Sequence, residues 1–353
     1  MGLLKESSVR DFDLLAYIGR FQPFHNGHKH VIDIALERAE RVAVVIGSHD
    51  KPRSPRNPWY THERAEMIRA CYSPSEQARL LFVPQVDHTY NLDKWLAGVT
   101  TGVYTAAWIK WKPDAWKIGL IGFDKDDTSF YLHHFPQWNP VYYDPRKIIN
   151  ATDIRRSYFD MNNSLPAVYA ERDVLPPATL EFMQKFAVTY DYLDVRDEWK
   201  AIEAYKRAWA FSPFAPTFQT ADAIVVQAGH VLLVQRDTAP GKGLWALPGG
   251  FVNPGEKVKD AALRELKEET KIRISGAQLR GSIVAQRMFD DPNRSERGRT
   301  VTQAYLIRLN EKTLPKVEGA SDARQAKWVP LGQLTRTNMF EDHFDIIEAM
   351  VAF

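Results

Sequence analysis

The chain has a single cysteine, Cys71, among its 353 residues. One thiol cannot close an intramolecular disulfide, and it cannot supply the paired thiolates of a cysteine-based zinc site. Long apolar runs are also lacking: stretches such as 42–46 and 224–226 are far too short to span a membrane, and the N-terminus has no apolar signal core. We therefore expect a cytoplasmic protein of a reducing compartment, with no membrane partner.

Neither sign of charge dominates, because 46 Lys and Arg residues are balanced by 44 Asp and Glu residues, for a net charge of +2. No segment is basic enough to act as an electrostatic arm for nucleic acid, so we expect no nucleic-acid partner. The 44% apolar and 25% charged fractions are ordinary for a globular chain and exclude disorder and fibres. At about 150 residues per domain, the length favours two domains.

Strand and helix patterns alternate along the first part of the chain. The pattern predicts strands at 13–19, 41–46, 80–83 and 115–121, and helices around 31–36, 61–71 and 93–105. This βαβ alternation is typical of a parallel sheet with helices on both faces. We expect the resulting α/β domain to occupy residues 1–190.

Residues 191–216 differ in composition from the preceding domain. A charged helical pattern at 197–207 is followed by Ala-Phe-Ser-Pro-Phe-Ala-Pro-Thr-Phe, whose two prolines lack backbone donors. We predict a linker here and a second domain at 217–353. Its pattern comprises strands at 221–227, 231–235, 279–287 and 301–308, a Gly/Pro-rich loop at 240–255, a helix at 258–269 and a final helix near 344–351. Mixed strands around one central helix predict an α/β sandwich.

The first candidate site is the segment 19–28, Gly-Arg-Phe-Gln-Pro-Phe-His-Asn-Gly-His, where a strand ends and a helix begins near Gly27. Free amide groups and the positive end of the helix dipole favour phosphate at such a place. His25 and His28 are three residues apart, so their imidazoles can converge on one anion. Taken alone, such a pair is also compatible with a surface or capping role. The segment is neither a Walker loop nor a Gly-x-Gly-x-x-Gly fingerprint.

The complete segment resembles the (H/T)xGH signature of the nucleotidyltransferase superfamily. Over roughly residues 13–185 the chain resembles the archaeal-type nicotinamide mononucleotide (NMN) adenylyltransferases. Three further stretches carry this resemblance: Gly47-Ser48 with Arg56-Asn57-Pro58-Trp59 and Glu63-Arg64; residues 121–126 with 135–138; and residues 149–155. Trp59 replaces the usual Phe, and Asn150-Ala151 depart from the paired small residues of the second signature, whereas Thr152 and Arg155 are kept. The resemblance implies a Rossmann-like nucleotidyltransferase domain.

The resemblance also implies an activity, in which the NMN phosphate attacks the α-phosphorus of ATP to release pyrophosphate and form NAD. Such a transfer mainly needs alignment and charge neutralisation. Catalysis is assigned to His25, His28 and Arg155. The residues implied to bind ATP and its phosphates are Gly19, Arg20, Phe21, His25, His28, Arg56, Thr152 and Arg155. We expect Mg²⁺ or Mn²⁺ to bridge the phosphates, held mostly by substrate oxygens and water.

Three residues resemble the nicotinamide side of these enzymes: Asp87, Asn91 and Trp95. An aromatic face at Trp95 could stack on the nicotinamide ring, and plain helix packing explains the same residue equally well.

The second candidate site combines three glutamates on one predicted helix. Glu265, Glu268 and Glu269 stand at positions i, i+3 and i+4, so their carboxylates crowd one face. Like charges at this spacing are unfavourable without a cation, and oxygen ligands suit Mg²⁺ or Mn²⁺. A solvated acidic helix face would explain the three glutamates alone, but it would not explain the fixed spacing to the Leu-Pro-Gly-Gly loop and Glu256 before them.

The full spacing is Gly250, five residues, Glu256, seven residues and then Arg264-Glu265-Leu266-Lys267-Glu268-Glu269-Thr270, and it is identified as a Nudix box. Lys271 replaces the terminal Gly of the box, so the turn after the helix is open to change. The resemblance implies a Nudix α/β/α sandwich with a mixed sheet and hydrolysis of a nucleoside diphosphate derivative by metal-activated water. The implied metal ligands are Gly249, Glu265, Glu268 and Glu269, of which Glu268 and Glu269 are also assigned to catalysis.

The arginine-rich loop at 289–299 resembles the corresponding loop of ADP-ribose pyrophosphatases. Its arginines could pair with a diphosphate or a terminal phosphate, so Arg294, Arg297 and Arg299 are assigned to ADP-ribose. Glu296 is a candidate general base. Trp245 could stack an adenine or belong to the core.

The sequence thus predicts a bifunctional enzyme that forms NAD from ATP and NMN and cleaves ADP-ribose to AMP and ribose 5-phosphate. Two alternatives stay open for the second domain: it senses ADP-ribose or NAD without turnover, or it hydrolyses another nucleoside diphosphate derivative. The first domain could likewise take another mononucleotide. The oligomeric state is left open, including a homo-oligomer.

Overall fold

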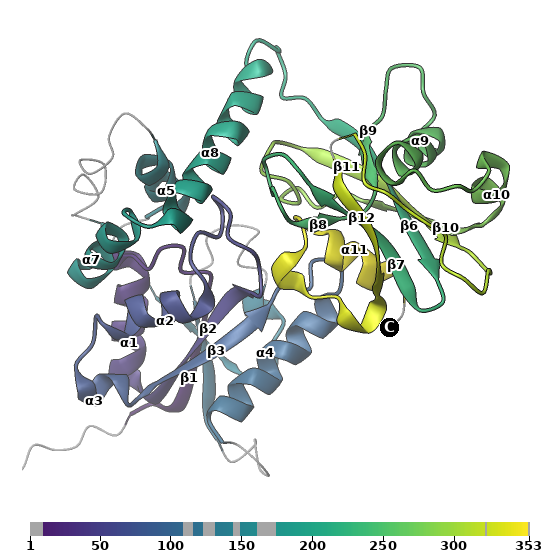
Figure 1. Ribbon diagram of the computed structural model, residues 1–353. Helices are drawn as coiled ribbons and strands as arrows, with labels where there is room; N and C mark the ends of the chain where they lie inside the picture. Colours follow the sequence, from purple (N-terminus) through teal and green to yellow (C-terminus); the bar gives the residue numbers. More distant parts are fainter. Residues whose placement is uncertain are drawn as a thin grey trace, which may run out of the picture. The chain divides into compact units, whose positions relative to one another are not determined.

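The computed structural model describes residues 10–108, 116–122, 131–143, 149–160, 174–321 and 323–351 (Figure 1). The chain divides into two compact units, Met1–His88 with Leu92–Leu193, and Thr89–Asn91 with Asp194–Phe353. The division falls within helix α8 (Tyr190–Ala208). Within the described ranges, no helix has both the length and the apolar character that crossing a membrane would require.

The first unit is built on a five-stranded sheet in which every neighbouring pair of strands is parallel. The strand order is β3-β2-β1-β4-β5. The strands are β1 (Phe12–Gly19), β2 (Ala39–His49), β3 (Leu80–Val86), β4 (Ile118–Gly122) and β5 (Asn139–Tyr142). This confirms the parallel α/β fold that the alternating pattern predicts.

Helices occur between these strands, namely α1 (Asn26–Arg38), α2 (Thr61–Arg69), α3 (Pro74–Gln77) and α4 (Leu92–Ala106), and three more follow β5: α5 (Ala151–Phe159), α7 (Pro177–Phe186) and α8. Val99 and Val103 of α4 are fully buried against alternate residues of the central strands, such as Leu14 and Ala43. The alternation follows from strand geometry, which turns every second side chain to the same face.

The second unit contains a mixed seven-stranded sheet with the order β10-β11-β6-β7-β12, to which β8 and β9 add at β7 and β6. Strands β6 and β11 are parallel, whereas the other pairs are antiparallel. The strands are β6 (Phe218–Gln227), β7 (His230–Arg236), β8 (Trp245–Ala246), β9 (Gly249–Phe251), β10 (Ile283–Phe289), β11 (Thr300–Arg308) and β12 (Ala323–Pro330).

One helix covers each face of this sheet. Leu263 and Leu266 of α9 (Val258–Thr270) pack with Val225 on one face. Ile346 of α11 (His343–Met350) packs with Ile224 on the other face. The predicted α/β/α sandwich with a mixed sheet is therefore confirmed. Three further elements complete the unit: α10 (Gly276–Gly281) and the 3-10 turns η3 (Leu331–Gln333) and η4 (Arg336–Asn338).

The element boundaries of the second unit differ from the sequence pattern in two places. The strand expected from residue 279 begins at Ile283, because Ser275 caps a short helix by accepting a hydrogen bond from the Gln278 N–H. The loop expected at 240–255 contains β8 and β9, which pair with distant strands and carry too few residues for a periodic pattern.

Candidate active sites

The first site lies where β1 ends and α1 begins. His25 is the N-cap of α1: its Nδ1 accepts the His28 N–H, and His28 Nδ1 accepts the His25 N–H, each at 3.3 Å. The two imidazole rings stack with centroids 3.6 Å apart and 18° between their planes. Both imidazoles therefore lie together at the positive end of α1, where the helix dipole favours an anion.

This reciprocal cap also fixes the hydrogen on each ring. Because each Nδ1 accepts a hydrogen bond, a neutral imidazole carries its hydrogen on Nε2. Burial lowers the pKa of His28 well below its ordinary value, and the neighbouring His25 lowers it further. At neutral pH, His28 is thus a hydrogen-bond donor without charge, and the rings of Phe21 and Phe24 pack against it at 4.8 and 6.0 Å.

Gln22 connects three of the motif segments. Its side chain accepts from the Trp59 N–H at 3.2 Å and donates to the Trp59 carbonyl at 2.9 Å. Its backbone carbonyl accepts from Arg155 Nη1 at 2.7 Å, and Arg155 Nη2 donates to Thr152 Oγ1 at 3.2 Å. The segments 19–28, 56–59 and 149–155 therefore meet in the first unit, although they lie far apart in the sequence.

Arg64 joins the loop that follows β1 to the last residues of β2. Its guanidinium is almost completely buried and donates to the carbonyls of Arg20, Gly47 and Ser48 at 2.7, 2.6 and 3.2 Å. Burial lowers its pKa to about 10. Arg64 is therefore a positioning residue for the site, a role that its place in the motif did not reveal.

The remaining predicted residues of this site are distributed as follows. Phe21 is buried with φ of 53°, and a Cβ on Gly19 would lie 2.8 Å from its ring. Arg20 is exposed and lies beside Asp87 at Gly47, where Asp87 accepts hydrogen bonds from the Ser48 N–H and Oγ.

Trp95 packs against Tyr131 and Phe135 at the edge of the core, as the packing alternative describes. Asn91 is exposed and belongs to the second unit, and Arg56 is partly buried. Residues 123–126 of the predicted motif lie outside the described residues.

The second site is organised around two consecutive glycines. Gly249 donates its N–H to Glu269 Oε2 at 3.0 Å. A Cβ on Gly250 would lie 2.6 Å from Glu265 Oε1, and one on Gly249 would lie 2.2 Å from Asp222 Oδ1. Three carboxylates thus approach the same short segment, and this approach requires residues without a side chain at 249 and 250.

Arg264 holds the rest of the acidic cluster. It donates to Glu256 at 2.9 and 3.0 Å, to Glu265 at 2.7 Å and to Glu268 at 3.0 Å. In the part of the chain that the structure describes, no three His, Cys, Asp or Glu side chains stand in a ready metal-binding arrangement. The donor set is nevertheless made of oxygens, and the space left at Gly249 and Gly250 brings Glu265 and Glu269 together, which fits a hard divalent cation.

The turn after the glutamate helix keeps the shape that a glycine would give it. Lys271, the C-cap of α9, has φ of 47° and ψ of 27°, in the left-handed region. Its N–H donates to the Lys267 carbonyl. The residue that departs from the box pattern thus adopts a backbone that glycine would adopt at lower cost.

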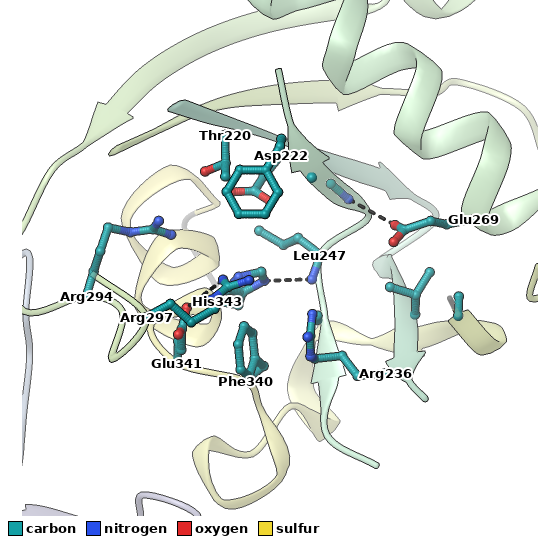
Figure 2. Close-up of a pocket in the computed structure, with 16 residues that line it drawn as sticks. Thr220, Asp222, Arg236, Leu247, Glu269, Arg294, Arg297, Phe340, Glu341 and His343 are labelled. Carbon is teal, nitrogen blue, oxygen red and sulfur yellow. Dashed lines mark hydrogen bonds and ion pairs between the residues drawn. The ribbon is translucent and has the colours of Figure 1, made fainter. Parts of the chain in front are cut away.

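A cavity of about 710 Å³, its open mouth included, lies beside these carboxylates (Figure 2). Arg294 and Arg297 of the predicted loop line it, and so does Gly249, whereas the cavity lining does not include Glu296 or Arg299. The other residues that line it are Thr220, Asp222, Val234, Arg236, Ala246, Leu247, Gly250, Phe251, Glu269, Ala323, Phe340, Glu341 and His343.

The two arginines that line the cavity differ in their partners. Arg294 is buried and pairs with Asp342 through two hydrogen bonds of 3.0 Å. Arg297 lies between the rings of Phe251 and Phe340, 5.7 Å from each centroid. Arg297 also has an acidic partner, Glu341, at 3.7 Å, which is longer than the contacts of Arg294 with Asp342.

Several charged groups of the cavity lie beyond the predicted motifs. Glu198, on α8, is not part of the lining; burial, together with the nearby Glu296 and Glu341, raises its pKa to about 7. Asp222 and His343 are buried within the lining. Asp222 interrupts an otherwise apolar strand pattern, which is the sequence signal that could have identified it. Trp245 packs against the apolar cluster that includes Ile346.

Comparison with known proteins agrees with the division of the chain into two units. The cytidylyltransferase-like family model matches residues 16–157, and the NUDIX domain model matches residues 217–350. Nicotinamide/nicotinic acid mononucleotide adenylyltransferase of Acinetobacter baylyi is 35% identical over 54% of this chain and 95% of its own length. ADP-ribose pyrophosphatase of Methanocaldococcus jannaschii is 32% identical over 36% of this chain and 69% of its own length.

One solved structure matches both units together. It is a bifunctional NMN adenylyltransferase/ADP ribose pyrophosphatase of Francisella tularensis, complexed with AMP and a manganese ion. The match has a TM-score of 0.85 and 34% identity, and it covers 96% of this chain and 98% of that one.

The two folds and their sites define a nucleotidyltransferase joined to a Nudix hydrolase in one chain. More narrowly, the chain belongs to the family of bifunctional NMN adenylyltransferases/ADP-ribose pyrophosphatases.

Proposed function

We propose that the first unit transfers the adenylyl group of ATP to NMN, giving NAD and pyrophosphate, and that the second unit hydrolyses ADP-ribose to AMP and ribose 5-phosphate. The observation that carries this proposal is the coexistence, in one chain, of the His25–His28 pair at a helix N-terminus and the glutamates at Gly249-Gly250.

In the first reaction, an oxygen of the NMN phosphate attacks the α-phosphorus of ATP while the bond to the bridging oxygen breaks and pyrophosphate leaves. Catalysis here depends on alignment and on stabilising charge at the phosphates. His28 offers a neutral Nε2–H donor, and the amide groups at the start of α1 offer the positive helix end. The exposed Arg20 supplies positive charge, and the buried Arg155 holds the loop in place through Gln22.

In the second reaction, water attacks one phosphorus of the diphosphate, and the bond from that phosphorus to the bridging oxygen breaks. The Gly249 carbonyl and the carboxylates of Glu265, Glu268 and Glu269 would hold a divalent cation, Mg²⁺ or Mn²⁺, which lowers the pKa of bound water and neutralises phosphate charge. Arg264 keeps Glu265 and Glu268 oriented. Arg297 lines the cavity and would bind the substrate there. In the first unit, the same cation would arrive with ATP.

Two variants of the full chain test whether the activities are separate. We expect His28→Ala to abolish NAD formation and to spare ADP-ribose hydrolysis, and Glu269→Gln to do the reverse. Products are separated by chromatography after incubation with ATP and NMN, or with ADP-ribose, in the presence of Mg²⁺. Loss of both activities in either folded variant would refute the two-site proposal.

The alternative in which the second unit only senses ADP-ribose is decided by the same assay. Binding of ADP-ribose by the wild-type chain, without release of AMP at saturating Mg²⁺ or Mn²⁺, would favour the sensor. The intact set of Glu265, Glu268 and Glu269 favours turnover.

A further inference from the structure

Two buried polar side chains in the cavity of the second unit have no role in the hydrolytic chemistry described above. Asp222, on β6, is 4% exposed, and His343, at the start of α11, is 7% exposed. Both line the cavity, and Figure 2 shows His343 beside Phe340, with Asp222 near Thr220. Each side chain keeps one polar atom that is not paired within the described residues, as shown below. A buried polar atom without a partner is costly, so we expect a ligand to supply the missing partner.

His343 is fixed as a hydrogen-bond donor. Its Nδ1 accepts the Leu247 N–H at 2.9 Å, so the neutral ring carries its hydrogen on Nε2. Burial lowers the pKa of His343, which keeps the ring neutral near pH 7. Among the residues that the structure describes, none accepts a hydrogen bond from His343 Nε2.

Asp222 is fixed as an acceptor. Its Oδ2 accepts from Thr302 Oγ1 at 2.6 Å, which holds the carboxylate in one orientation. Its Oδ1 lies against Gly249, and no donor to this oxygen occurs within the described ranges. The lining of one cavity therefore includes both a donor and an acceptor.

Planar groups lie around Asp222 and His343: a phenyl ring and a guanidinium. Phe340 packs edge-on against His343 at 5.6 Å, and Arg236 lies over the Phe340 ring at 4.2 Å. Such surfaces suit a heteroaromatic ring, which can stack on phenyl and guanidinium planes. A diphosphate does not suit the same place, because the Asp222 carboxylate would repel it.

We propose that Asp222 and His343 recognise the base of the substrate, with Asp222 accepting from the exocyclic amino group of adenine and His343 donating to the neighbouring ring nitrogen. This inference rests on the proposed ADP-ribose hydrolysis and assigns its base specificity. A 6-oxo purine places a carbonyl lone pair where adenine has its amino hydrogens, so that two acceptors face each other at Asp222.

The test compares two substrates on the full chain: ADP-ribose, and inosine diphosphate ribose, in which a 6-oxo group replaces the amino group. We expect wild-type kcat/KM to favour ADP-ribose by about 10- to 100-fold, as expected when a buried polar group is left unpaired. In Asp222→Asn, the amide can donate to the 6-oxo group, so this ratio should fall by at least about tenfold. In His343→Asn, whose Oδ1 can still accept from Leu247, KM for ADP-ribose should rise about tenfold with kcat retained.

The control is Asp260→Asn, on the same helix as the box glutamates but paired with Arg280 at 2.8 Å, which should leave the substrate ratio unchanged. A wild-type enzyme that hydrolyses both substrates equally would overturn the base assignment, and so would an Asp222→Asn enzyme that loses both activities in equal proportion. If Asp222→Asn does not fold, competition on the wild type decides: AMP should inhibit at least about tenfold more tightly than IMP, and equal inhibition refutes the inference. Absence of any ADP-ribose hydrolysis by the wild type refutes the proposed function instead.

Discussion

The imidazole rings of His25 and His28 stack 3.6 Å apart, and the Nδ1 of each accepts the backbone N–H of the other. One pair of side chains thus both caps α1 and directs the Nε2–H of His28 away from the cap. The two roles use different ring nitrogens, so they can be separated by substitution.

We expect His28→Asn and His28→Gln to fail in opposite ways. Asn keeps an acceptor at the Nδ1 position, so it should retain the cap and lose about 10²- to 10³-fold in adenylyltransferase kcat. Gln can reach the Nε2 position with an N–H donor, so it should retain more activity but lose the half of the cap in which residue 28 accepts the His25 N–H, which lowers stability by about 0.5 kcal/mol. Steady-state kinetics and thermal unfolding measure the two effects. If one variant were both the more active and the more stable, the capping role and the donor role of His28 would not be separable.

Gly250→Ala should impair hydrolysis more than stability. Its Cβ would lie 2.6 Å from Glu265 Oε1, so the carboxylate must move from the glutamate cluster. We expect a loss of about tenfold or more in ADP-ribose kcat, because small displacements of catalytic groups are costly. Gly281→Ala is the matched control, since nothing lies within 4 Å of a Cβ there. Equal activity of the two variants would show that the close approach at Gly250 is irrelevant to the reaction.

Lys271→Gly should stabilise the second unit by about 0.5–1 kcal/mol, because Lys271 has φ of 47° and glycine adopts this region without steric cost. Lys267→Gly, in the interior of the same helix, should destabilise by about 1 kcal/mol. Chemical denaturation measures both. A destabilised Lys271→Gly chain would mean that the contacts of the lysine side chain outweigh the strain of its backbone.

The stability of the second unit should depend on pH through Glu198. Its pKa is raised from the usual 4.5 to about 7, so between these values the folded chain binds more protons than the unfolded chain. Stability therefore falls as pH rises through this range, and the penalty is complete above pH 7.

We expect Glu198→Gln to raise the free energy of unfolding by about 2 kcal/mol at pH 8 and to leave it nearly unchanged at pH 4.5. Thermal or urea unfolding at the two pH values measures the difference. Glu203→Gln serves as the control, because Glu203 pairs with Lys206 at 3.1 Å. A gain of equal size at both pH values would show that burial of the charge is not the cause.

Much of the fold was predictable because the strands of the first unit are short apolar runs between helices, a pattern that local sequence determines. The strands of the second unit that were missed are β8, β9 and β12, which exist through pairing with residues distant in the sequence. The first unit's β5 has only four residues, three of them exposed, and was missed for lack of a pattern.

The residues of the candidate sites also fall into two groups, those that the sequence could identify and those whose contacts only the structure reveals. The motif residues of the box and of the segment 19–28 could be identified through their resemblance to known families, and their roles stay predictions. His343 lies almost a hundred residues from Leu247, whose N–H it accepts, and Arg64 is held by three carbonyls, one in the loop after β1 and two at the end of β2. Such roles depend on backbone atoms, which the sequence does not distinguish.

The segment from Leu247 to Gly249 carries two N–H groups that point to side chains: Leu247 to His343, and Gly249 to Glu269. The chain bends at Pro248 between these two amides, and their partners come from the two helices that cover opposite faces of the sheet, His343 from α11 and Glu269 from α9. A single bend thus couples the two sides of the cavity, and inserting or deleting one residue there would move one amide away from its partner.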